Sequence, residues 1–287
     1  MSLFVRGPFA SILDFARRDR LSGIGAVLFA SLVLLGLIGP VLPLGDAEEI
    51  GVGPRLAAPA ADWLLGTDEL GRSALPRIVE GLRATFLLAS MAVILTGILG
   101  TLVGLTAAYA GGIVDVAIMR MVDVLFAFPP LLLAILIAAV LEPGGTSAII
   151  AISLITLPLF VRVVRAVALS IVERSYVIAA EVSGAGFLRV IVFHLLPNVL
   201  GAVIVQLTYA LSIGMLVESE LSFLGLGVQP PDASLGSLLR LGSVYLTAAP
   251  WLVFPAGLLL AAAILSVNLL GDGLRDLMDP LRGRSLR

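Results

Sequence analysis

The chain has 287 residues, of which 59% are apolar and only 13% are charged, about half the charged fraction of an average globular protein. With a mean hydropathy of +1.11, this composition argues against a soluble enzyme, which needs more polar surface. The net charge of −2 gives no basis for binding nucleic acid.

Charge-free runs set out the predicted elements along the chain. Each run is long enough for one apolar helix of about 20 residues to cross the hydrocarbon core, and none is clearly long enough for two. The runs do not alternate as the strands of a membrane barrel do. We therefore predict an all-α membrane protein with six transmembrane helices, the first retained rather than cleaved as a signal peptide. The runs are 21–45, 84–114, 124–141, 143–161, 190–217 and 241–271.

The distribution of arginine predicts the orientation. Six crossings put both termini on one side, and if that side is the cytoplasm, 13 of the 18 basic residues lie inside. We expect a cytoplasmic N-terminal segment at 1–20, a membrane domain at 21–271 and a cytoplasmic tail at 272–287. The outer segment 46–83 is expected to form a lid or a short helix.

Three residue types are absent or scarce, and each absence removes a class of chemistry. There is no cysteine, so disulfides, thiolate metal sites and cysteine nucleophiles are excluded. A single histidine, His194, excludes a histidine-rich metal site and argues against a Ser-His-Asp triad; we interpret it as an interfacial side chain. All basic residues are arginine, and because a Walker A loop requires lysine, this chain is not expected to hydrolyse ATP by that route.

Glycine and proline mark points of contact and bending. Gly100 and Gly104 form a GxxxG pair, which lets helix backbones approach closely. We favour ordinary packing within the chain over a contact between subunits. Pro129, Pro130 and Pro197 are expected to end or kink helices and are candidate hinges.

The inside segment 173–197 carries the most informative pattern. Helix formers from Tyr176 onward precede Gly184, a C-terminal stop signal, and a second helical stretch runs through Leu196 and Pro197 into the membrane. This predicts a short helix across the cytoplasmic face that fits a groove on another protein. On composition alone, an ordinary connecting loop is the favoured alternative.

This segment resembles the EAA loop of the integral membrane subunits of bacterial ABC importers. Two positions depart from the family pattern, because Ile178 replaces the glutamate and His194 stands at an apolar position. The resemblance implies a cytoplasmic coupling helix that docks on an ATPase. The residues assigned to this coupling are Tyr176, Ile178, Ala179, Ala180, Gly184, Leu196 and Pro197.

Four further segments resemble, in the same order, the C-type subunits of dipeptide, oligopeptide and nickel permeases. They match the GTDxxGRD stretch, the VD-x-x-x-AFP segment, the E-A-A-LSFLGLG stretch and the C-terminal signature. Ser73 and Glu220 are departures, replacing an aspartate and a small residue. The segments are 65–72, 122–129, 218–227 and 268–276, the last followed by Asp279-Pro280.

The resemblance implies the type I permease fold of ABC importers and a place in the bacterial inner membrane. A homologous B-type permease subunit would complete the pathway. Two cytoplasmic ATPase subunits, or one fused chain, would hold ATP and Mg, so this chain needs no cofactor. An extracytoplasmic binding protein would deliver substrate. Short peptides are the favoured substrate, and nickel or another small solute is the alternative. A secondary transporter or a channel subunit would not explain the EAA-like loop.

Charged residues near the predicted boundaries admit two interpretations each. Asp123 is interpreted as a boundary charge or helix cap rather than a pathway acid. Arg162 and Arg165 share a helix face and are interpreted as inside-boundary charges, with contact to an ATPase as the alternative.

Glu218 and Glu220 end the fifth predicted helix on different faces. We favour a solvated outer mouth over a negative vestibule that attracts an amino terminus or a cation. The glycine-rich stretch that follows is too short to span, which suggests a broken helix or an outer gate. The candidate pathway or gate residues are Glu218, Glu220, Phe223, Leu224, Gly225 and Gly227.

Overall fold

The computed structural model describes residues 20–278, and within this range the chain is helical, with one isolated bridge between Thr67 and Ser73 and no strand. The predicted tail beyond Met278 and the predicted N-terminal segment, Arg20 excepted, lie outside the described residues. By length and apolar composition, five helical segments of the described range are able to cross a membrane, and a bent pair of helices makes a sixth. The six-helix prediction therefore holds when that pair counts as one span.

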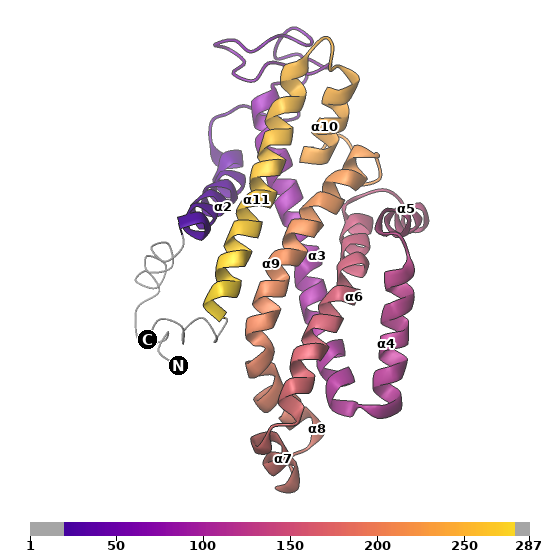
Figure 1. The fold of residues 1–287 in the computed structure, drawn as a ribbon. Coiled ribbons are helices and arrows are strands. Elements are labelled where there is room, and N and C mark those ends of the chain that lie inside the picture. Colours follow the sequence, from indigo (N-terminus) through magenta and orange to yellow (C-terminus); the bar gives the residue numbers. More distant parts are fainter. Residues whose placement is uncertain (1–19, 279–287) are drawn as a thin grey trace.

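The long helices run roughly alongside one another as a bundle, α5 lies across it, and the two short helices α7 and α8 lie beyond one end (Figure 1). Their bounds are α2 Arg20–Ile38, α3 Ala74–Ala110, α4 Gly112–Ala127, α5 Pro130–Leu141, α6 Gly145–Val172, α7 Ser175–Val182, α8 Phe187–Val190, α9 Leu196–Phe223, α10 Leu235–Val244 and α11 Val253–Met278. Short 3-10 turns at Gly39–Val41 and Pro250–Leu252 follow α2 and precede α11.

The third predicted crossing is a pair of helices joined at a sharp bend. It was expected as one helix over 124–141, whereas α4 begins at Gly112 and is bent from α5 by 92°. The cause is the proline pair. Pro129 pushes Phe128 into an extended conformation (φ −75°, ψ 133°), and Pro130 then starts α5 at a position where its missing N–H costs nothing. The bend expected at these prolines is therefore present.

Helix α3 begins ten residues before the charge-free run 84–114, because Arg77, Glu80 and Arg83 continue the helix instead of ending it. The segment 42–73 before it is irregular, so the short helix considered for this region does not form. Charge marks where a chain leaves the hydrocarbon core, but it does not end a helix.

Small residues let α3 and α6 pack closely. A Cβ at Gly100 would lie 2.7 Å from the Phe160 ring, and one at Gly104 would lie 2.9 Å from Val164 Cβ. Nearby, the hydroxyl groups of Thr96 and Thr156 are 2.9 Å apart. The GxxxG pair thus serves packing within the chain, as favoured from the sequence.

Pro197 does not break its helix. It lies in the first turn of α9, and the preceding residues Ile191–Leu195 form a π-helical turn that continues from α8. A wider turn accommodates a residue without an N–H donor, so the helical path runs unbroken from Phe187 to Phe223.

Candidate functional site

The coupling helix predicted from the sequence is present as α7, and Gly184 ends it in the left-handed region with φ +85°. The Ala185 N–H donates to the Ala180 carbonyl at 3.0 Å, and the Gly184 N–H donates to the Glu181 carbonyl at 2.9 Å. This pair of bonds is the Schellman motif. Glycine adopts this conformation without the steric cost that a Cβ would bring.

One face of α7 is anchored and the other is open. Val177 is fully buried in an apolar cluster with Ile171 of α6 and Leu195 before α9. In contrast, Tyr176 and Ile178 are 41% and 49% exposed, and α7 lies at the far end of the bundle (Figure 1). The exposed face can meet another protein while Val177 connects the helix to the membrane bundle.

The remaining predicted coupling residues lie in two places, on α7 and in the first turn of α9. Ala179 is exposed and Ala180 is half-buried, both on α7. Leu196 is half-buried and Pro197 exposed in the first turn of α9. These two residues shape the junction between the π-helical turn and α9 rather than extending the exposed face of α7. That all of these residues couple to an ATPase stays a prediction.

Two aromatic contacts, which the sequence did not indicate, hold this end together. The rings of Tyr176 and His194 are 6.3 Å apart, so His194 lies against α7, and its interfacial position stays a prediction. Tyr109, near the end of α3, lies 5.1 Å from the ring of Phe187 in α8. The α7–α8 segment therefore contacts α3, α6 and the start of α9.

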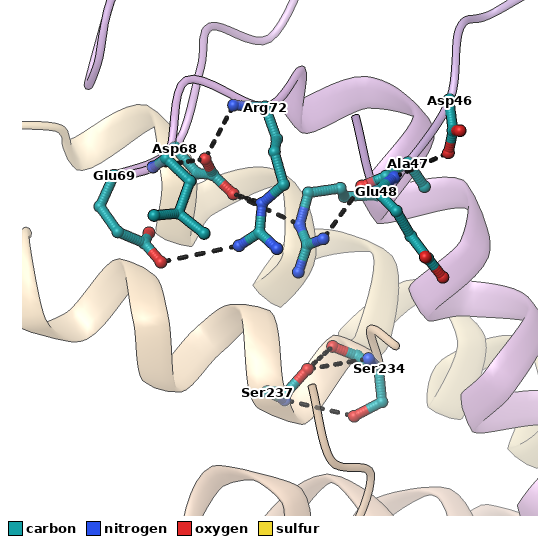
Figure 2. A network of polar contacts seen from close by, with 10 residues as sticks. Asp46, Ala47, Glu48, Asp68, Glu69, Arg72, Ser234 and Ser237 are labelled. Carbon is teal, nitrogen blue, oxygen red and sulfur yellow. Dashed lines mark hydrogen bonds and ion pairs between the residues drawn. The ribbon is translucent and has the colours of Figure 1, made fainter. Parts of the chain in front are cut away.

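At the opposite end, buried charges fold the irregular segment before α3. Asp68 accepts hydrogen bonds from the Leu70 and Arg72 N–H groups at 2.9 Å each and from Arg72 Nε at 2.7 Å (Figure 2). Arg77 Nη1 donates to the Ala47 carbonyl at 3.0 Å, and its Nε lies 3.5 Å from Asp68. The stretch 65–72, noted from the sequence only as a family resemblance, therefore has a structural role.

Two cavities lie beside this charged network. One of about 340 Å³ is lined by Asp46, Glu48 and Glu80, among others, and one of about 310 Å³ by Arg72 and Arg240, among others. Within residues 20–278, no group of three or more His, Cys, Asp or Glu side chains is arranged to hold a metal ion.

Glu218 is not at a solvated mouth. Its carboxylate is fully buried and accepts hydrogen bonds from Thr85 Oγ1 at 2.8 Å and Ser222 Oγ at 2.7 Å. The Thr85 hydroxyl accepts in turn from the Leu235 N–H at 3.2 Å. Glu218 thus connects α9, α3 and the start of α10, while Glu220 is exposed on another face. The solvated outer mouth favoured from the sequence is wrong for Glu218.

The glycine-rich stretch after Glu220 forms a helix end rather than a broken helix. Helix α9 continues through Phe223, and the N–H groups of Leu226 and Gly227 both donate to the Leu221 carbonyl at 2.8 and 3.1 Å. Gly225 has φ +80°. Phe223 and Leu224 remain partly exposed beside this turn, 44% and 49% respectively, and their role in a gate stays a prediction.

The expected boundary charges form ion pairs between α4 and α6. Arg162 Nη2 lies 2.7 Å from Asp123 Oδ1, and the guanidinium lies 4.3 Å from the centre of the Phe126 ring. Arg165 pairs through two nitrogens with Asp115. Asp123 lies inside α4, so it is not a helix cap.

Comparison with known proteins places this architecture in a family. Residues 100–284, well over half of the chain, match the model described as "binding-protein-dependent transport system inner membrane component". The chain belongs to this family. A chain of the MetNI methionine ABC transporter, in an inward-facing conformation, has the same fold, with a TM-score of 0.56 at 18% identity over 70% of this chain and 96% of that one. The type I permease fold is thereby confirmed.

Curated relatives are similar over nearly their whole length. The dipeptide transport system permease protein DppC of Haemophilus influenzae is 36% identical over 95% of both chains. The di/tripeptide transport system permease protein DppC of Pseudomonas aeruginosa is 39% identical over 90% of this chain and 87% of its own. This chain is thus a multi-pass membrane permease of the ABC importer type, a transport component.

Proposed function

We propose that this chain is the C-type permease subunit of an ATP-driven, binding-protein-dependent importer of short peptides. The observation that carries this proposal is α7, a short helix exposed at one end of the bundle, ended by Gly184 and anchored by Val177. The similarity to dipeptide permeases over almost the full chain supports peptides as the substrate.

The proposed mechanism is alternating access driven from the α7 end. ATP binding by partner chains closes an ATPase dimer, and the groove that holds α7 moves with it. Val177 transmits this movement because it is packed, without exposed surface, against Ile171 of α6 and Leu195 before α9. The two orientations of the bundle need to differ by only a few kcal/mol, roughly, for ATP binding to switch them.

The proposed assembly follows from the same reasoning. The α7 end faces the cytoplasm, as the arginine distribution favours, and both termini are cytoplasmic. A homologous B-type permease subunit completes the pathway, two ATPase subunits or one fused chain bind ATP and Mg, and an extracytoplasmic binding protein delivers the peptide. This chain has no lysine for a Walker A loop and carries no cofactor of its own.

The test is reconstitution of the assembled transporter in proteoliposomes with its binding protein. We expect ATP-dependent uptake of a dipeptide, ATP hydrolysis that rises when loaded binding protein is added, and no hydrolysis by the purified single chain. Mass spectrometry of the ligand on the co-purifying binding protein identifies the substrate. A nickel ion bound to that protein would show that the substrate is nickel, the alternative solute, and not a peptide. Uptake without any ATPase partner would indicate a secondary transporter and refute the proposal.

A further inference from the structure

The two cavities at the end of the bundle opposite α7 differ in the charge of their walls. The cavity of about 340 Å³ is lined by four acids and one arginine, and the cavity of about 310 Å³ by three arginines and two acids. We call them the acidic cavity and the basic cavity. Arg77 and Asp232 line both, so the two cavities adjoin. Each has the volume of a small-molecule site.

The basic cavity is lined by guanidinium groups that do not use all of their N–H donors. Arg72 and Arg77 are both more than nine-tenths buried, and they share the carboxylate of Asp68, which lies 2.7 Å from Arg72 Nε and 3.5 Å from Arg77 Nε. Among the described residues, neither terminal nitrogen of Arg72 donates a hydrogen bond, although Nη2 lies 3.6 Å from Glu69 (Figure 2). Within the same range, Arg77 donates only from Nη1, and its enclosed Nε has no hydrogen bond. Two buried cations therefore keep unused donors beside this cavity.

The unused donors indicate the chemistry of a ligand. Guanidinium groups bind carboxylates through paired N–H···O bonds, and Arg240, exposed on α10, adds a third guanidinium to the same wall. In the acidic cavity, Asp46 and Glu48 are exposed and form no ion pair within residues 20–278. An inorganic anion would leave these acids unmatched. The adjoining cavities fit a ligand with a carboxylate at one end and an ammonium group at the other.

We propose that the two cavities together form a binding site for a short zwitterionic peptide, with the carboxyl terminus in the basic cavity and the amino terminus in the acidic cavity. An extended dipeptide is about 7 Å long, so it reaches from one adjoining cavity into the other. The inference rests on the proposed function, in which the end opposite α7 is the extracytoplasmic side that the binding protein approaches. A peptide released there meets this site before it enters the membrane.

The experiment measures binding of dialanine to the assembled transporter in nanodiscs, without the binding protein, by saturation-transfer NMR. Two analogues each lack one charge, since dialanine amide has no carboxylate and N-acetyl-dialanine has no ammonium group. We expect saturable binding of dialanine and binding of each analogue that is weaker by about tenfold or more, the loss expected for one charge-assisted contact. An absence of saturable dialanine binding, or equal binding of either analogue, would overturn the proposal.

Exposed charges of the two cavity walls provide the variants. Arg240→Gln should weaken dialanine binding about tenfold and leave the binding of dialanine amide unchanged, because the amide has no carboxylate to lose a partner. Glu48→Gln should weaken dialanine binding and leave that of N-acetyl-dialanine unchanged. The matched controls, Arg55→Gln and Glu49→Gln, remove exposed charges of the irregular segment 42–73 that line neither cavity, and they should bind dialanine normally. Equal losses in the controls would indicate the general field of the surface and overturn the site.

Uptake and attachment of the binding protein, measured on the same assembly, separate the two proposals. Peptide uptake by an assembly that binds no dialanine refutes the site and leaves the proposed function intact. Dialanine binding with the expected dependence on both end groups, in an assembly that takes up no peptide, supports the site and refutes the substrate. If Arg240→Gln weakens attachment of the binding protein but not dialanine binding, this arginine contacts that protein, and the peptide site is overturned.

Discussion

Replacement of Gly184 by valine isolates the contribution of one backbone conformation to coupling. Gly184 has φ +85°, and a Cβ built there meets no atom within 4 Å. The penalty is therefore the strain of a left-handed backbone alone, about 1–2 kcal/mol for an ordinary L-residue. If the ATPase groove accepts α7 only with this turn intact, the docked chain must keep the strained conformation, whereas the free loop can relax out of it. Affinity for the ATPase should then fall about five- to thirtyfold, since 1.4 kcal/mol is a factor of ten.

Gly186 supplies the matched control for this prediction. It lies two residues further along the same loop, a Cβ there also meets no atom within 4 Å, and its φ is −74°. Gly186→Val adds the same side chain without the strain, so it should bind the ATPase nearly as well as the unmodified chain. Gly184→Asn should lie between the two, because asparagine tolerates the left-handed region better than valine.

The assay is titration of the purified ATPase chains onto the detergent-solubilised permease, together with stimulated ATP hydrolysis and peptide uptake. All three should fall together for Gly184→Val. Equal losses for Gly184→Val and Gly186→Val would show that bulk in the loop matters rather than its backbone conformation. No loss for either would show that the turn is not part of the docked state, and the account of α7 would be wrong.

Four other changes test further parts of the structure. Ala180→Arg should insert into the membrane normally but abolish stimulated ATP hydrolysis, because the added bulk blocks the groove; hydrolysis at the normal level would contradict docking through this face. Ile178→Glu should weaken ATPase binding or leave it unchanged, and clearly tighter binding would show that the groove still expects the family's carboxylate. Glu218→Ala leaves buried hydroxyl groups without an acceptor, at about 1–3 kcal/mol for each, so its thermal unfolding midpoint should fall below those of Glu218→Gln and the unmodified chain. Midpoints of both variants equal to that of the unmodified chain would exclude a structural role for this carboxylate. A cysteine at position 73 in place of serine should react with an impermeant reagent on intact cells or spheroplasts, whereas one at position 183 should react only after lysis, and the reverse pattern would invert the topology.

Local patterns predicted local structure well. The helix formers before Gly184 indicated both α7 and the residue at which it ends, because a helix terminator acts within one turn. The proline pair at Pro129 and Pro130 indicated a bend for the same reason. However, the run 124–141 suggested one crossing. Hydropathy indicates which residues lie in the membrane, but it does not indicate the direction of the helix axis.

Features that depend on distant residues could not be predicted. From the sequence, Glu218 is a charge at the end of a helix. Its partner Thr85 lies 133 positions earlier, and only the fold brings the two side chains together. Likewise, nothing in the sequence pairs Asp123 with Arg162, which approaches it from another helix. In both cases the sequence showed that the residue was unusual, and only the packing of the helices showed what it contacts.

Helix α3 is 37 residues long, or about 55 Å, which is much longer than the thickness of the hydrocarbon core. Tyr109 contacts α8 near one of its ends, while Arg77 and Thr85 belong to the buried polar networks near the other. A rigid rod with both ends engaged acts as a lever. A tilt of 10° about its midpoint displaces each end by about 5 Å, in opposite directions. A push received beside Tyr109 and a rearrangement around Thr85 would then be two ends of a single rotation, with no relay of smaller movements between them.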